Sequence, residues 1–478
     1  MNAYSIPRAA SPASFRPGRP RAKRAPKAGH IRDLTRGLDA VRICLYGQVV
    51  IAISQIHVYL GAVGRLRPAL VLAVLGLSAV FLKPSLIDAS NLTRSWASKA
   101  VIGLVILSLG GVVFGLSPGS SVAFIVDNWS KNLVFFFLLV VGLRSARDIS
   151  LMVWAFVISV GVVILLGFTV LDLEPTATGL GRIEGNGGFD ANDQGMIFVM
   201  ALPLAVLLSY NSGRIGRIIS GAVIVLVPMG IALTGSRGAM VGLVASSPFL
   251  FFSLSRISLA RRLGGIGVLV GGLLVAAPSG YWQQMETILD SEEDYNRTSD
   301  YGRVAIAKRG FGYMMGRPIF GLGINNFRRA EGEISPIMRE RQAAGLAVRW
   351  IAPHNTYVQV GAELGVFALA IWLGMIYGST VGLWRLRRRI PVVWECQTPE
   401  RKFLRELCLL LPTAVIAFAV TSFFLTHAYS PPGYILFALA GALHLFVRRE
   451  LAYDRLSHER RAVQGLQRQR APLVRARG

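Results

Sequence analysis

The sequence predicts an all-α membrane protein with about twelve transmembrane helices. Hydrophobic residues make up 53% of the 478-residue chain, whereas charged residues make up only 16%. The apolar residues stand in long blocks such as VIGLVILSLGGVVFGL and WAFVISVGVVILLGFTVL, not at amphipathic spacing. Blocks that approach about 20 residues cross a hydrocarbon core of about 30 Å with every backbone group bonded inside the helix.

Twelve segments of this kind follow one another without a convincing internal repeat, which disfavours a transporter built from duplicated halves. The first segment is the weakest, because Gln48, Gln55 and His57 interrupt it. The predicted spans are 41–62, 67–82, 99–116, 129–143, 149–171, 193–210, 217–234, 238–254, 263–281, 355–383, 407–426 and 431–447.

The charges between the spans predict the orientation of the chain. With the N-terminus in the cytoplasm, nearly every strongly basic short segment falls on the cytoplasmic side, as the positive-inside rule requires. An even number of spans then places both termini there. The predicted cytoplasmic loops are 83–98, 144–148, 211–216, 255–262 and 384–406. We therefore predict a basic tail at 1–38, a transmembrane domain at 39–447 and a second basic tail at 448–478.

A net charge of +25 often indicates a nucleic-acid partner. Here the charge lies in short clusters between apolar blocks and at the chain ends, so we predict no nucleic-acid binding. The segment 1–38 lacks the apolar core of a signal peptide, and we expect it to be disordered. It either lies on anionic lipid headgroups or serves only as a topogenic charge block. The three cysteines are scattered and predict neither a disulfide framework nor a metal site.

The predicted outward segments are 117–128, 172–192, 234–238 and 282–354. The last is by far the longest, and it mixes the acidic run DSEEDY with many arginines. Long outside segments are translocated regardless of charge, and a loop of this length is usually functional. Two stretches in it, RVAIAKRGFGYMMG and ISPIMRERQAAGLAVRW, are predicted to be short amphipathic helices along the membrane surface.

Two outward turns carry candidate binding arginines. In GLGRIEGNGGFDANDQGM, Arg182 is an isolated cation, and Asn192 or Asp193 is expected to cap the helix that follows. In LTGSRGAM, Arg237 stands in a tight turn between two spans, where it can meet a specific phosphate. The alternatives are a flexible loop with a helix cap for the first turn and a snorkelling arginine for the second.

The long loop supplies a third candidate region, TSDYGRVAIAKRGFGYMMGRPIFGLGINNF. Arg303 begins its amphipathic stretch, and Arg317 stands near the end of that stretch as a supporting residue. The GLG of this run is not a dinucleotide fingerprint, because no strand precedes it and its spacing is wrong.

The fourth region, PHNTYVQVGAELGVFAL, joins the long loop to the next span. On a helix, Asn355, Gln359 and Glu363 share one face. A buried polar stripe is costly unless it faces a cavity inside the protein, so Glu363 is a functional candidate. His354 stands at the mouth of that cavity, and its near-neutral pKa suits proton transfer. The alternative is a capping His-Asn pair with a structural glutamate.

Together these residues suggest arginines that hold a di-anion beside a group that handles a proton. The residues leave open whether His354 or Glu363 is the base. A pyrophosphate-linked lipid donor fits such a site, because arginines stabilise the leaving pyrophosphate without a metal or another cofactor. The acidic run Asp290–Asp294 is the one candidate cluster for a divalent ion, and it is more typical of a solvated loop face.

These residues resemble the O-antigen ligase and O-antigen or exopolysaccharide polymerase superfamily of bacterial membrane glycosyltransferases. The resemblance covers about residues 40–447. The motif that begins at His354-Asn355 and includes Gly365 ends at position 368, which is Ala here. This residue departs from the ligase form of the motif and favours a polymerase. The four features that carry the resemblance are RIEGNGGFDAND before a span, the TGSRGA turn, the run RPIFGLGINNF, and His354-Asn355 followed by Gly365.

The resemblance implies a fold similar to GT-C glycosyltransferases in the bacterial inner membrane and a metal-independent, inverting transfer. The donor would be a glycan on undecaprenyl pyrophosphate, and the acceptor a second glycan or a lipid A–core sugar. His354 would activate or orient the acceptor hydroxyl. The residues that would bind the pyrophosphate are Arg237, Arg303 and Arg182, with Asn192, Asn355, Gln359 and Arg317 in support.

Two other functional classes compete with this interpretation. A transporter or flippase of lipid-linked oligosaccharide predicts charged residues in the middle of the spans, and few spans here contain any. A non-enzymatic membrane scaffold would tolerate the loss of His354 or Arg237.

Overall fold

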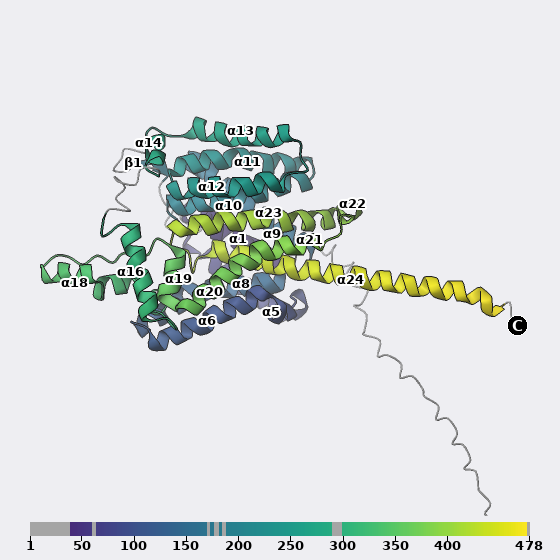
Figure 1. Ribbon diagram of the computed structural model, residues 1–478, viewed down its shortest axis with the longest axis horizontal. Coiled ribbons are helices and arrows are strands. Elements are labelled where there is room, and N and C mark those ends of the chain that lie inside the picture. The colour runs from purple at the N-terminus through teal and green to yellow at the C-terminus, as the bar shows by residue number, and fades with distance from the viewer. Residues whose placement is uncertain are drawn as a thin grey trace, which may run out of the picture.

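The computed structural model describes residues 39–59, 64–169, 173–175, 181–183, 188–288 and 299–475. These residues form a bundle of helices that run side by side, with one short β-hairpin (Figure 1). The first elements are α1 (Ala40–Ser54), α2 (Ile56–Tyr59), α4 (Pro68–Leu82), η3 (Pro84–Leu86), α5 (Ser90–Arg94), α6 (Trp96–Phe114), α7 (Pro118–Phe124), η4 (Ile125–Trp129), α8 (Ser130–Gly142), α9 (Ala146–Thr169), β1 (Leu173–Pro175) and β2 (Gly181–Ile183).

The second half of the chain contains the outward loop and the last membrane helices. Its elements are α10 (Ala191–Asn211), α11 (Arg214–Thr234), α12 (Arg237–Ser253), α13 (Leu259–Ala276), α14 (Tyr281–Glu286), α16 (Arg303–Gly316), α17 (Phe327–Glu333), α18 (Pro336–Ala343), α19 (Thr356–Leu364), α20 (Val366–Tyr377), η5 (Gly378–Gly382), α21 (Leu383–Arg388), α22 (Trp394–Gln397), α23 (Pro399–Thr421), η6 (Ser422–Phe424) and α24 (Pro431–Arg475).

Eight helices or continuous helix runs among the described residues are long and apolar enough to cross a membrane. Three more apolar helices, α1, α4 and α12, are shorter. The prediction of an all-α, multi-pass membrane protein is therefore confirmed, and the number of twelve spans stays a prediction. The eight are α6, α7 with η4 and α8, α9, α10, α11, α13, α20 with η5 and α21, and α23 with η6.

Every predicted span contains at least one helix, but several predicted boundaries are wrong. Most of the predicted outward loop 117–128 is helical, because Pro118 starts a helix at a position that needs no N–H and the run then continues to Gly142. The predicted span 355–383 is broken at Gly365, which separates α19 from α20. The predicted span 41–62 ends early, since Gln55 adopts a left-handed conformation after α1.

The C-terminal helix is longer than its apolar segment. α24 continues as one helix to Arg475, so most of the segment predicted as a basic tail from residue 448 is helical. Figure 1 shows this extension projecting from the end of the bundle. The predicted tail 1–38 lies outside the described residues.

Burial distinguishes the centre of the bundle from its rim. In the apolar 18-residue stretch of α10, 89% of the residues are buried, whereas only 6% are buried in the corresponding stretch of α13. α10 packs against α9, α11, α12 and α23, whereas α13 packs mainly against α11 and exposes leucines and valines. Such exposed apolar side chains are expected on a helix whose outer surface faces lipid.

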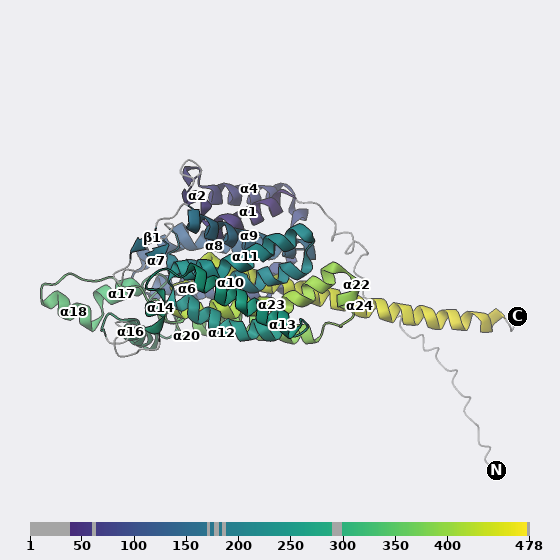
Figure 2. The ribbon, with the colours of Figure 1, turned by 90° about the horizontal axis from the view of Figure 1, so that it is seen from above.

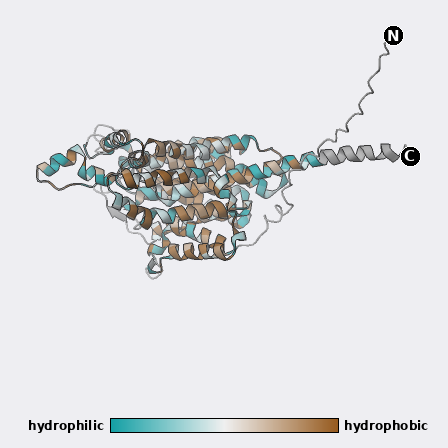
Figure 3. Cartoon of the chain, turned by 90° about the horizontal axis from the view of Figure 1, so that it is seen from below, coloured by the Kyte–Doolittle hydropathy of each residue, from teal (hydrophilic) through white to brown (hydrophobic). Residues whose placement is uncertain are grey.

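The two ends of the bundle differ. The hairpin, α14, α16, α17 and α18 lie at one end, and α5, α22 and the extension of α24 lie at the other (Figures 1 and 2). The predicted outward segments therefore gather at one end. Figure 3 shows hydrophobic residues along the bundle and hydrophilic ones on α18 and on the coloured part of the α24 extension.

The two predicted amphipathic helices of the long loop have different outcomes. RVAIAKRGFGYMMG is α16, which runs across the ends of the membrane helices rather than along them (Figure 1). The second predicted helix is shorter than expected, because α18 ends at Ala343 and Gly345 then adopts a left-handed conformation.

Candidate functional site

The short helix α19 is the frame of the site, and both of its ends are defined by sequence. Asn355 is its N-cap, and its side-chain oxygen accepts hydrogen bonds from the N–H groups of Tyr357 and Val358 at 2.9 and 3.0 Å. Gly365 ends it with φ 86°. A Cβ at this position would lie 2.5 Å from the carbonyl oxygens of Pro318 and Ile319, so only glycine fits.

The run RPIFGLGINNF wraps around the C-terminal end of α19. The N–H groups of Leu322 and Gly323 donate to the carbonyls of Ala362 and Glu363 at 2.8 and 2.9 Å. Gly321 and Gly323 have left-handed backbones, which permit this close approach. The RPIFGLGINNF run and α19 are separate regions of the sequence, but in the fold they form one packed unit.

Glu363 fixes this unit from inside. Its carboxylate accepts hydrogen bonds from the N–H groups of Asn325 and Phe327, both at 3.0 Å, and from the hydroxyl of Tyr429 at 2.8 Å. The residue is only 2% exposed. Its contacts are those of a structural anchor for the loop between α16 and α17.

The predicted polar stripe on α19 is buried, but its members have different surroundings. The side-chain oxygen of Gln359 accepts from the N–H of Ala428 at 3.1 Å. Gln359 and Glu363 thus bind neighbouring loops, and Asn355 alone of the three lines the pocket described below. Most of the stripe therefore anchors the loops around α19, and only Asn355 forms part of the cavity wall.

His354 precedes the cap and has a left-handed backbone with φ 45°. Its N–H donates to the hydroxyl of Thr426 at 3.1 Å. Partial burial, and then the positive charge of Arg303, lower the pKa of His354 below its ordinary value. The imidazole is therefore neutral at pH 7 and can accept a proton.

Arg237 is held by the tight turn that the sequence predicted. α11 ends at Thr234, Gly235 adopts φ 57°, and Ser236 caps α12 so that Arg237 is its first residue. The guanidinium donates to the hydroxyl of Thr287 at 2.8 Å. This bond orients the side chain toward the long loop.

Arg182 supports this turn from the hairpin. Its Nε donates to the carbonyl oxygen of Thr234 at 2.8 Å, and its Nη2 donates to the side chain of Asn192 at 3.1 Å. The expected cap of α10 is wrong: Asp190 is the N-cap, and Asp193 three residues later completes a reciprocal capping box. Arg182 thus connects the start of α10 to the Arg237 turn.

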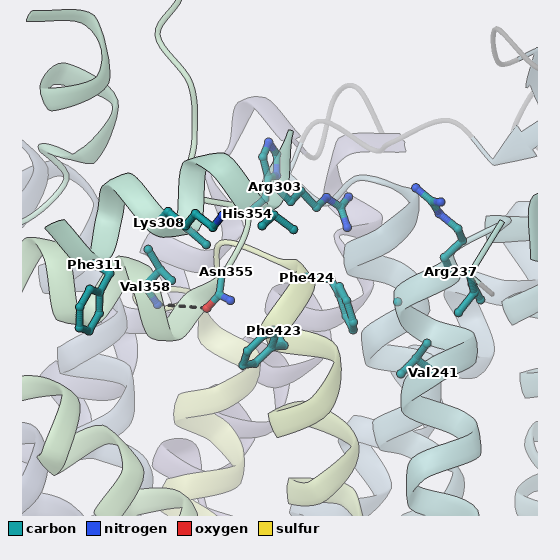
Figure 4. A pocket seen from close by; sticks show the side chains of 14 residues that line it. Arg237, Val241, Arg303, Lys308, Phe311, His354, Asn355, Val358, Phe423 and Phe424 are labelled. Carbon is teal, nitrogen blue, oxygen red and sulfur yellow. Dashed lines mark hydrogen bonds between the residues drawn. The ribbon is translucent and has the colours of Figure 1, made fainter. Parts of the chain in front are cut away.

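A pocket of about 710 Å³ brings the arginines and His354 together. Arg303 extends from α16 and Arg237 from α12 toward one another, with His354 beside Arg303 (Figure 4). The rest of the lining is mostly apolar and includes Val241, Val304, Phe311, Val358, Phe423 and Phe424. A cationic mouth above an apolar wall suits an anionic headgroup that is attached to a hydrocarbon chain.

The comparison with known families agrees with this geometry. A family model described as O-Antigen ligase matches residues 221–373, which begin in α11 and end in α20. This match supports the resemblance of the chain to the O-antigen ligase and polymerase superfamily. No curated protein matches the chain.

The segment matched by the O-antigen ligase family contains Arg237, Arg303 and His354. All three line the pocket, as does the predicted supporting residue Asn355. The predicted site residues outside its lining are Arg182, Asn192, Gln359, Glu363 and Arg317. Arg317 donates to the carbonyl oxygen of Phe114 at 3.1 Å and so attaches the end of α16 to α6.

Two residues in or near this pocket were not predicted from the sequence. Lys308 lines the pocket from α16 and adds a third cation. It stands four residues after Val304 and three before Phe311, so the helical period identifies the face that it shares with them. His427 lies in the loop before α24 and bonds Asp193, far away in sequence, and no spacing signal predicts that pair.

The acidic run Asp290–Asp294 lies outside the described residues. Within the described ranges, no three His, Cys, Asp or Glu side chains gather as metal ligands would.

Proposed function

We propose that this protein transfers a glycan from undecaprenyl pyrophosphate to a hydroxyl of an acceptor sugar at the periplasmic face. The observation that carries the proposal is the meeting of Arg237, Arg303 and His354 in one pocket with apolar walls. The family match supports glycan transfer, and the identity of the lipid carrier is part of the proposal.

The cations of the pocket stabilise the leaving group of the proposed reaction. In the reaction, the acceptor oxygen forms a bond to the anomeric carbon while the bond from that carbon to the pyrophosphate oxygen breaks. The pyrophosphate leaves with the electron pair, and its growing charge is stabilised by Arg237 and Arg303 through charge-assisted hydrogen bonds. Lys308 stands on the same face of α16 as a further cation. The arginines supply this stabilisation without a metal ion.

His354 accounts for the proton. Its lowered pKa keeps the imidazole neutral, so it can take the proton of the attacking hydroxyl. Attack on the side opposite the pyrophosphate gives inversion at the anomeric carbon. Glu363 is assigned a positioning role, because its three hydrogen bonds direct it to backbone and tyrosine donors away from the pocket lining.

The acceptor distinguishes a ligase, which uses lipid A–core sugar, from a polymerase, which uses a second lipid-linked glycan. Ala368 departs from the ligase motif, but it is completely buried in α20 and does not line the pocket. The preference for a polymerase therefore rests on the sequence pattern alone. Separate assays with each acceptor decide between the two.

The test is glycan transfer by purified protein in lipid vesicles, with undecaprenyl-pyrophosphate-linked glycan as the donor. We expect Arg237→Ala and Arg303→Ala each to lower turnover by about 10²–10³-fold, as the loss of an oxyanion-stabilising donor does. The matched control is Arg339→Ala, an exposed arginine of the same loop on α18. It should keep full activity.

Full transfer by both pocket variants would refute the pyrophosphate assignment. Transport of labelled lipid-linked glycan that survives His354→Ala would instead favour a flippase. Activity is expected to persist in chelator, and a strict requirement for an added divalent ion would direct attention to Asp290–Asp294.

A further inference from the structure

The strained conformation of His354 is held by a segment outside the region matched by the family model. A non-glycine residue in the left-handed region costs about 1–3 kcal/mol and persists only where its surroundings impose it. Here the N–H of His354 donates to Thr426 at 3.1 Å. The loop that precedes α24 therefore participates in placing the catalytic histidine.

This loop follows the first turns of α19 closely. The hydroxyl of Thr356 donates to the carbonyl of Leu425 at 2.8 Å and accepts from the N–H of His427 at 3.0 Å. The N–H of Ala428 donates to Gln359 at 3.1 Å. With the bond between His354 and Thr426, four hydrogen bonds connect residues 425–428 to residues 354–359. The position of His354 thus depends on the position of this loop.

The side chain of His427 attaches the loop to α10 on its other side. Its Nε2 lies 2.7 Å from Oδ1 of Asp193, and its Nδ1 contacts the hydroxyl of Ser430. His427 is only 3% exposed, and both of its ring nitrogens have partners inside the protein. Asp193 is itself fixed, because its other oxygen accepts from the N–H of Asp190 at 3.1 Å.

The bond to Asp193 completes a path between the two functional halves of the pocket. Arg182 bonds both Thr234, in the turn before Arg237, and Asn192, next to Asp193. The path therefore runs from the Arg237 turn through Arg182 and the start of α10 to the His427 loop and His354. Every connection along it is a hydrogen bond or the chain itself.

We propose that His427 and Asp193 form a positioning pair that fixes the distance between Arg237 and His354. The inference rests on the proposed function, in which Arg237 holds the leaving pyrophosphate and His354 takes the proton. Neither member of the pair lines the pocket, so neither contacts the donor directly. A displacement of about 1 Å between catalytic groups can cost about 10²-fold in rate, so loss of the positioning pair should have a measurable effect on turnover.

The test compares His427→Ala, His427→Gln and Asp193→Ala in the vesicle assay. We expect each alanine variant to lower kcat by about 10²-fold with little change in the KM for the donor, because the pocket cations remain. His427→Gln retains an amide donor for Asp193 and should recover part of the loss. The double alanine variant should lose no more than either single variant, since the pair acts as one unit. The control is His458→Gln, on the exposed extension of α24.

Three outcomes would overturn the inference. The first is normal kcat in His427→Ala. The second is a double variant whose losses multiply, because the two side chains would then act independently. The third is a loss of protein from the membrane together with a lower Tm in His427→Gln, which would assign the pair a merely structural role. If His354→Ala and Arg237→Ala retain full transfer, the proposed function itself fails, and that result is separate from the behaviour of His427.

Discussion

Substitution of Glu363 separates a catalytic base from a structural anchor. One carboxylate oxygen accepts from the N–H of Phe327, and the other accepts from the N–H of Asn325 and the hydroxyl of Tyr429. In Glu363→Gln the amide oxygen can take the place of the second oxygen and keep two of the three bonds. The amide NH₂ then faces the Phe327 N–H, and one buried donor loses its partner.

The expected cost follows from these bonds. One unsatisfied buried donor costs about 1–3 kcal/mol, so Glu363→Gln should fold with a lower Tm. Glu363→Ala strands all three donors, and the summed penalty approaches the 5–15 kcal/mol that stabilises a typical domain. We expect Glu363→Ala to be lost from the membrane and Glu363→Gln to accumulate there.

The assay is glycan transfer in vesicles, normalised to folded protein, together with thermal unfolding of the extracted protein. An anchor predicts that Glu363→Gln keeps most of its turnover, whereas loss of a general base costs about 10²–10⁴-fold. The reasoning would be refuted if Glu363→Gln were folded but inactive while His354→Gln kept its activity. Glu363 would then be the base.

Two further predictions concern the backbone and the electrostatics around α19. Gly365→Ala should lower the Tm and the turnover, because the new Cβ would contact two carbonyl oxygens at 2.5 Å and the backbone there has a positive φ. The matched control is Gly374→Ala on α20, where a new Cβ would meet no atom within 4 Å. An equal Tm in both variants would contradict the steric argument. Arg328 lowers and Asp190 raises the pKa of His354. In the proposed reaction the neutral imidazole is the form that takes the proton. Arg328→Gln should therefore move the acid limb of kcat/KM to higher pH and Asp190→Asn should move it to lower pH, and shifts of the same sign would exclude His354 as the titrating group.

The membrane fold was largely predictable because its signal is local. A run of apolar residues identifies a span by its length alone, and the basic clusters between runs are short and regular. The predicted ends of the spans were wrong where the backbone conformation, and not the hydropathy, determines where a helix begins or ends. Gly365 breaks an otherwise apolar segment, and Pro118 starts a helix in a segment that looked like a loop.

The candidate site was predictable only in part, because it depends on contacts between distant segments. Arg237, Arg303 and His354 were found from their outward positions, and the pocket brings them together. The sequence placed Glu363 on one face of α19 with Asn355 and Gln359 and predicted that this face meets a cavity, but the partners of Glu363 come from the RPIFGLGINNF run and from Tyr429. Whether a buried carboxylate acts as a base or as an anchor is decided by those partners, which hydrophobic periodicity does not reveal.

The spacing between His354 and Gly365 in this chain has a physical explanation in α19. The nine residues of this helix advance about 13.5 Å, and each residue turns the helix by about 100°. Asn355 sets where the helix starts, and Gly365 sets where the RPIFGLGINNF run can approach it. Adding or removing one residue would rotate Glu363 away from Asn325 and Phe327 as long as His354 stayed bonded to Thr426. The number of residues between His354 and Gly365 therefore sets both the length of α19 and the direction in which Glu363 points. For this reason His354 and Gly365 belong to one site although they contact different segments.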